Sequence, residues 1–107
     1  MFFKSKISAV AEAVGTEISF PRNKDAVLQK AREAKPQLII VDLHNQKIEA
    51  AALATELKSD EELRAIPLLG FFSHVETELQ RTALSAGFDQ VIPRSVFARD
   101  LSKILSV

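Results

Sequence analysis

The chain has 107 residues, enough for one small domain over residues 1–107 and too few for two. Its 14 basic and 14 acidic residues cancel, so bulk charge gives no reason to expect a nucleic-acid or membrane partner. Cysteine is absent, which excludes disulfides and thiolate metal sites, and no apolar run approaches the length of a membrane span. These properties predict a soluble cytoplasmic protein.

The first third of the chain predicts two helices with an edge strand between them. Apolar residues recur at helical spacing over residues 2–14, and Gly15 ends that helix. Residues 17–20 alternate between polar and apolar, as in a half-covered edge strand. Asn23 is expected to cap the next helix, which stops before Pro36.

The middle of the chain predicts two buried strands. A continuous apolar run over residues 37–43 is typical of a strand that is covered on both faces, and Asp42 stands where this strand ends. Because sites in open α/β sheets lie at the carboxyl ends of the strands, Asp42 is the first candidate functional residue. A helix over residues 49–59 follows, and the apolar run over residues 66–72 predicts the second strand.

The last third of the chain repeats the alternation of helix and strand. Ser73 is expected to cap a helix that Gly87 ends, with Glu76 as its capping-box partner. Residues 90–93 predict a very short strand, and Ser95 is expected to cap the last helix. Strands that alternate with helices pair in parallel through right-handed crossovers, so we expect an α/β sheet with the two apolar strands at its centre.

Three stretches together resemble a known family. They are KPQLIIVDL at residues 35–43, IPLL at 66–69 and AGFD at 86–89, and their order and separations are similar to those of the receiver domain of bacterial two-component response regulators. The likeness runs over residues 2–105. It implies a flavodoxin-like (CheY-like) doubly wound parallel sheet in three α/β/α layers.

The resemblance also implies roles for residues at the carboxyl ends of the strands. In that family an Asp at the end of strand 3 accepts a phosphoryl group from a histidine kinase, and Asp42 matches this Asp. A Thr or Ser normally ends strand 4; Phe72 falls there, and Ser73 is the nearest substitute for the hydroxyl. A Lys normally ends strand 5, where this chain has Arg94, whose longer planar head is not equivalent to Lys.

The acidic pair that holds Mg²⁺ in the family has no counterpart in this chain, and neither has the first strand that carries it. Asp42 alone is expected to hold Mg²⁺ poorly, because this ion keeps most of its waters unless it meets more anionic ligands. Three explanations stay open. The chain is clipped at its N-terminus, or the sheet has rearranged to four strands, or a second chain supplies an element and makes a homodimer.

These departures favour a receiver or pseudo-receiver that is not an enzyme and that recognises a protein partner, either a histidine kinase or an output protein. In the family the face formed by helix 4, strand 5 and helix 5 commonly docks partners; here it would comprise Gln80, Arg81, Gln90, Ser95, Val96, Phe97 and Arg99. The alternatives are a phosphoryl-accepting response regulator clipped at its N-terminus and a small flavodoxin-like cofactor binder. The latter is less favoured, because the chain has no glycine-rich phosphate loop.

Overall fold

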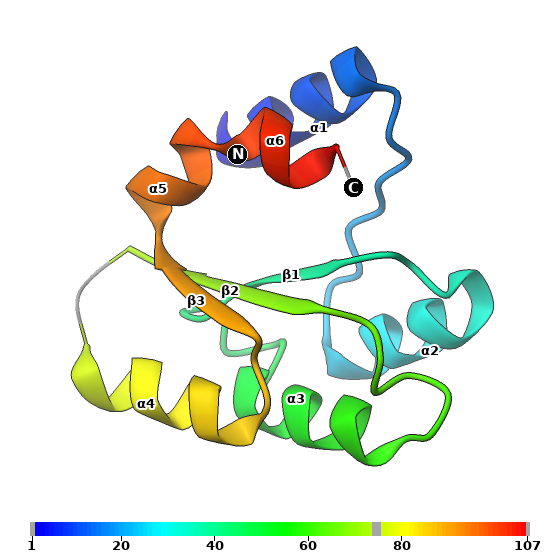
Figure 1. The fold of residues 1–107 in the computed structure, drawn as a ribbon, viewed down its shortest axis with the longest axis vertical. Coiled ribbons are helices and arrows are strands. Elements are labelled where there is room, and N and C mark those ends of the chain that lie inside the picture. The colour runs from blue at the N-terminus through cyan, green and yellow to red at the C-terminus, as the bar shows by residue number, and fades with distance from the viewer. Residues whose placement is uncertain (1, 74–75, 107) are drawn as a thin grey trace.

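The structure, a computed structural model, describes residues 2–73 and 76–106. Strands and helices alternate after two opening helices, as Figure 1 shows. The elements are α1 (Phe2–Val14), α2 (Lys24–Ala34), β1 (Ile39–Asp42), α3 (Ala50–Ser59), β2 (Leu68–Phe72), α4 (Thr77–Ala86), β3 (Gln90–Pro93), α5 (Arg94–Arg99) and α6 (Leu101–Leu105). None of the helices in the described ranges is long and apolar enough to cross a membrane.

The sheet has three parallel strands in the order β1-β2-β3. Val41 lies opposite Gly70, and Gly70 lies opposite Val91. Helices α1, α5 and α6 cover one face of the sheet, and α2, α3 and α4 cover the other (Figure 1). The predicted three-layer, flavodoxin-like α/β/α architecture is therefore confirmed.

Each face of the sheet carries its own apolar core, because successive side chains of a strand point to opposite faces. On β2, Leu68 and Phe72 belong to the core shared with α2 and α3, whereas Leu69 and Phe71 belong to the core shared with α1, α5 and α6. Every residue of β2 is buried, as expected for the central strand of the sheet. In the second core the rings of Phe71 and Phe97 stack, with centroids 4.7 Å apart and planes 5° from parallel.

The prediction of an edge strand over residues 17–20 is wrong, since residues 16–22 have no regular secondary structure. A strand needs a neighbour that takes up its backbone hydrogen bonds, and no backbone bond to residues 17–20 is found in the described part of the chain. Without this strand β1 lies at the edge of the sheet, so only one of the two apolar strands expected at the centre is central.

Capping was predicted correctly for one helix and wrongly for two. The side chain of Asn23 accepts a hydrogen bond from the backbone N–H of Ala26 at 2.8 Å, which confirms the predicted cap of α2. The predicted cap by Ser73 is wrong: α4 begins at Thr77, and its N-cap residue Glu76 makes no side-chain capping bond. The described helix therefore starts later than the capping-box pattern indicates.

The last helix starts earlier than predicted and is divided. Pro93 has extended backbone angles and occupies the N-cap position, so α5 begins at Arg94 and the predicted cap by Ser95 is wrong. Asp100 leaves the helical geometry and separates α5 from α6. This bend lets α6 pack along α1, which brings Leu101 and Leu105 into the second core.

Candidate functional site

The predicted site residues follow the carboxyl edge of the sheet in strand order. Asp42 is the last residue of β1, Ser73 follows the end of β2, and Arg94 follows the end of β3. The strands are in register here, since Asp42 lies opposite Phe71 and Phe71 lies opposite Ile92. Parallel pairing therefore brings three residues that are distant in the sequence to the carboxyl ends of neighbouring strands.

Asp42 is half-buried and fixes the turn that follows β1. Its carboxylate oxygen Oδ1 accepts a hydrogen bond from the backbone N–H of His44 at 3.0 Å, and its carbonyl accepts one from the N–H of Asn45 at 3.0 Å. An Asp that bonds to the backbone two residues on makes an Asx-type turn. One carboxylate oxygen is thus engaged in local structure.

Asp42 and Arg94 both line a groove of about 1330 Å³ that runs along the outer edge of β1. Ser73 is exposed and is not among the residues that line this groove. Phe72, at the position where the resemblance implies a hydroxyl, is buried in the core and 6% exposed. The structure therefore brings together two of the three predicted site residues.

The side chains around Asp42 do not fit a Mg²⁺ site. Residues 2–73 and 76–106 contain no group of three or more His, Cys, Asp or Glu side chains that could hold a metal ion. Mg²⁺ demands near-octahedral oxygen ligands and is held in proteins by carboxylates together with waters and phosphates. Among the described residues, Asp42 therefore lacks the neighbouring carboxylates that would help it to hold this ion.

The outer edge of β1 is open toward the same groove. The N–H of Ile39 donates to the carbonyl of Pro67, and the N–H of Leu43 donates to that of Phe71, each at 3.0 Å. Alternate residues of a parallel strand bond to the same neighbour, so the N–H and C=O of Ile40 point to the opposite edge. No backbone partner of Ile40 is found within the described residues.

The face predicted to dock partners is largely on the surface. Six of its seven residues are exposed or half-exposed: Gln80, Arg81, Gln90, Ser95, Val96 and Arg99. Phe97 is 0% exposed and stacks on Phe71, so its prediction as a surface residue is wrong. On a helix of 3.6 residues per turn, Phe97 points to the sheet while its neighbours Ser95 and Arg99 point outward.

Sequence reasoning missed a basic hollow beside the end of β1. It is lined by Lys4, Phe20, Pro21, Arg22, Asn45 and Lys47. Its three cations come from three distant segments of a chain with no net charge. They do not belong to a local run of basic residues that would have predicted the hollow.

Sequence comparison relates the chain to bacterial signalling proteins. The response regulator protein VraR of Staphylococcus aureus (strain Mu3) is 34% identical over 91 residues, which are 85% of this chain and 41% of the relative. The same protein of strain NCTC 8325 matches with the same identity and coverage. The chain thus spans about two fifths of the length of the curated relatives it matches. Protein-family models give no match.

Solved structures similar to this chain are also signalling domains. A signal receiver domain of a histidine kinase from Syntrophus aciditrophicus has a TM-score of 0.78 at 23% identity and matches 98% of this chain and 83% of its own. The phosphorylated cyanobacterial phytochrome response regulator RcpA has a TM-score of 0.74 at 21% identity, over 96% of this chain and 82% of its own. The Mn²⁺-bound response regulator Rcp1 has a TM-score of 0.66 at 18% identity, over 94% of this chain and 81% of its own. At these identities the likeness establishes the fold.

Proposed function

The chain is a homologue of the response regulators and has the fold of their receiver domains, and from this premise we propose that it acts as a pseudo-receiver in two-component signalling. In this role it transmits a signal by recognising a protein partner, a histidine kinase or an output protein. It catalyses no reaction of its own. Asp42 occupies the phosphoacceptor position without serving as an efficient acceptor.

The surroundings of Asp42 are the observation that carries this proposal. Phosphoryl transfer relies on positioning and on neutralising the charge of the moving group, usually by metal ions and cationic side chains together. One carboxylate oxygen of Asp42 already accepts a hydrogen bond from the N–H of His44. The described side chains include no group of three or more His, Cys, Asp or Glu residues that could hold a metal ion. Phe72 offers no hydroxyl to a phosphoryl oxygen. The charge of an incoming phosphoryl group is therefore poorly compensated.

Phosphoryl acceptance at Asp42 is the second candidate function, and the position of Arg94 favours it. Arg94 lines the same groove as Asp42, and a guanidinium fork can bind a phosphoryl group in a bidentate manner. If Arg94 compensates the charge by itself, Asp42 accepts a phosphoryl group from a small donor.

Incubation with acetyl phosphate and Mg²⁺ separates the two functions. We expect the intact mass to stay unchanged, or to gain a phosphoryl group only in a minor fraction that is also present in the Asp42→Asn variant. Rapid addition of one phosphoryl group that Asp42→Asn abolishes would establish the phosphoacceptor. The Arg94→Gln variant would then lose labelling if the guanidinium compensates the charge.

The surface of α4, β3 and α5 is the proposed partner-docking face. Its exposed part combines long polar side chains with two cations, and Arg99 is already paired with Asp100 at 3.0 Å. Arg81 extends from α4, its side chain 69% exposed, with only a loose contact of 3.4 Å to Glu78. Aromatic and Arg side chains dominate binding energy at interfaces, so Arg81 is the first residue to test against a kinase domain. Arg81→Glu is expected to weaken binding, whereas Arg32→Glu on α2 is the matched control far from this face.

We further propose a homodimer, which the open edge of β1 supports. An edge strand with an unpaired backbone is a template for pairing with another chain. Light scattering across a concentration series is expected to reveal a dimer. Ile40→Pro removes the outward N–H while leaving the bonds of Ile39 and Leu43 to β2 in place, so it should shift the protein toward the monomer. A wild-type protein that stays monomeric at high concentration would contradict the proposal.

A further inference from the structure

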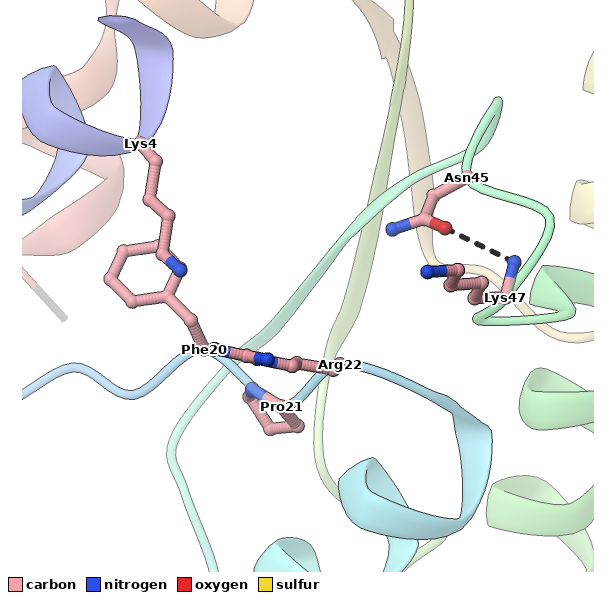
Figure 2. A pocket seen from close by; sticks show the side chains of 6 residues that line it. All are labelled: Lys4, Phe20, Pro21, Arg22, Asn45 and Lys47. Carbon is pink, nitrogen blue, oxygen red and sulfur yellow. Dashed lines mark hydrogen bonds between the residues drawn. The ribbon is translucent and has the colours of Figure 1, made fainter. Parts of the chain in front are cut away.

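Three segments meet in the basic hollow beside the end of β1. Lys4 comes from the first turns of α1, Arg22 from the irregular segment before α2, and Lys47 from the loop after β1. The hollow has a volume of about 310 Å³, at the lower end of the range for small-molecule sites. The described residues that line it include no carboxylate. Figure 2 shows the side chains of Lys4 and Phe20 on one side and those of Asn45 and Lys47 on the other.

In the part of the chain that the structure describes, the three cations of the hollow have no carboxylate partner. Within the described ranges, no ion pair joins Lys4, Arg22 or Lys47 to an acidic side chain. Lys24, two residues after Arg22, differs, because its Nζ lies 2.6 Å from a carboxylate oxygen of Glu56. Three like charges around one hollow repel each other unless an anion lies between them. The hollow therefore has the electrostatics of an anion site.

Two hydrogen bonds and one cation–π contact fix the residues of the hollow in the absence of a ligand. The N–H of Lys47 donates to the side-chain oxygen of Asn45 at 3.1 Å, and the carbonyl of Lys47 accepts from the N–H of Lys24 at 3.3 Å. The Nζ of Lys4 lies 4.7 Å from the centre of the Phe20 ring, a cation–π contact that ties α1 to the segment before α2.

Asn45 adds a neutral donor to the cations. Because its amide oxygen is engaged by Lys47, its NH₂ group is the end left for a ligand. In Figure 2 this nitrogen lies on the side of the amide opposite to the backbone nitrogen of Lys47. An amide donor beside cations suits the oxygens of a phosphate or carboxylate group.

We propose that the basic hollow binds a small oxyanion with at least two negative charges, either a phosphate compound or a polycarboxylate, between Lys4, Arg22 and Lys47. The ligand sits at the mouth of the groove along β1, because Lys4, Phe20, Pro21 and Asn45 line both the hollow and the groove. This site uses none of the residues assigned to phosphoryl acceptance, so it stands independently of the proposed function.

The test is an NMR titration of the ¹⁵N-labelled protein at low ionic strength, with sodium pyrophosphate in one arm and sodium citrate in the other. We expect saturable shifts confined to the amides of Lys4, of residues 20 and 22–24 and of residues 45–48, with a dissociation constant on the order of 1 mM that rises with salt. Arg22→Gln and Lys47→Gln should each weaken binding about threefold or more, as expected for exposed charge pairs. Lys6→Gln on α1 and Lys103→Gln on α6 are matched controls that line neither cavity, and they should leave binding unchanged.

The two arms identify the source of the anion. Tighter binding of pyrophosphate assigns the hollow to phosphate compounds, and equal or tighter binding of citrate assigns it to polycarboxylates. Absence of saturable shifts with both probes at concentrations on the order of 10 mM would overturn the proposal. So would equal weakening by Lys6→Gln and Arg22→Gln, since the shifts would then report general charge screening.

Discussion

Replacement of Phe97 by Ala should cost the domain a large part of its stability. The Phe97 side chain is 0% exposed and stacks on Phe71 with centroids 4.7 Å apart. Removal of a fully buried Phe ring typically costs about 3–5 kcal/mol, because the lost transfer free energy adds to that of the cavity left behind. The total free energy of unfolding of a small domain is about 5–15 kcal/mol. Phe97→Leu keeps most of the volume and loses the ring contact, so it should cost about 1–2 kcal/mol.

Urea unfolding followed by circular dichroism measures these costs. With a slope of about 2 kcal/mol per molar urea, Phe97→Ala should lower the midpoint by about 2 M. Leu84→Ala is the surface control, since Leu84 is 53% exposed, and it should change the free energy of unfolding by less than about 0.5 kcal/mol. If Phe97→Ala lowers the free energy of unfolding by less than about 1 kcal/mol, the ring is not part of the core. The conclusion that Phe97 does not belong to the partner-docking face would then be wrong.

Three further changes test the scaffold around the site. Asp89→Asn should destabilise the fold, because the N–H of Leu68 donates to this carboxylate at 2.8 Å and holds its pKa below the ordinary value. A carboxylate whose pKa is lower in the folded protein stabilises the fold at pH values above its unfolded-state pKa of about 3.9. The loss of unfolding free energy in Asp89→Asn should therefore be full at neutral pH and should shrink as the pH of the unfolding experiment falls below about 4. Gly70→Ala should cost about 1–3 kcal/mol in urea unfolding, because the added Cβ would lie 2.8 Å from a methyl carbon of buried Leu43. Asn23→Ala should lower the free energy of unfolding by about 1 kcal/mol through loss of the α2 cap, and an unchanged midpoint would refute the capping bond.

The sequence predicted those elements whose signals are local. Helical spacing and Gly15 define α1, the side chain of Asn23 caps α2, and continuous apolar runs give β1 and β2. These patterns depend on neighbours within one or two turns of the chain. Residues 17–20 carry an equally good local pattern, yet they form no strand, because pairing depends on a partner strand that a local pattern does not reveal.

The candidate site was predicted in part for a similar reason. Asp42 was found from its position after an apolar strand, and the family resemblance pointed to Arg94; the structure places both along one groove. The basic hollow could not be predicted, since Lys4, Arg22 and Lys47 are distant in the sequence and come together only through the packing of α1 and the loop after β1. Phe97 was misassigned because a list of helix residues ignores which side of α5 faces the sheet.

Treatment with beryllofluoride and Mg²⁺ tests the pseudo-receiver most directly, because this phosphoryl mimic reports on the acceptor site in the intact protein. The amide spectrum of the ¹⁵N-labelled protein is recorded before and after addition, with Asp42→Asn as the control. We expect no saturable shift at residues 42–44 and 94 that distinguishes the wild-type protein from Asp42→Asn. Tight binding of beryllofluoride that perturbs these residues in the wild type and disappears in Asp42→Asn would contradict the pseudo-receiver and establish Asp42 as a competent phosphoacceptor.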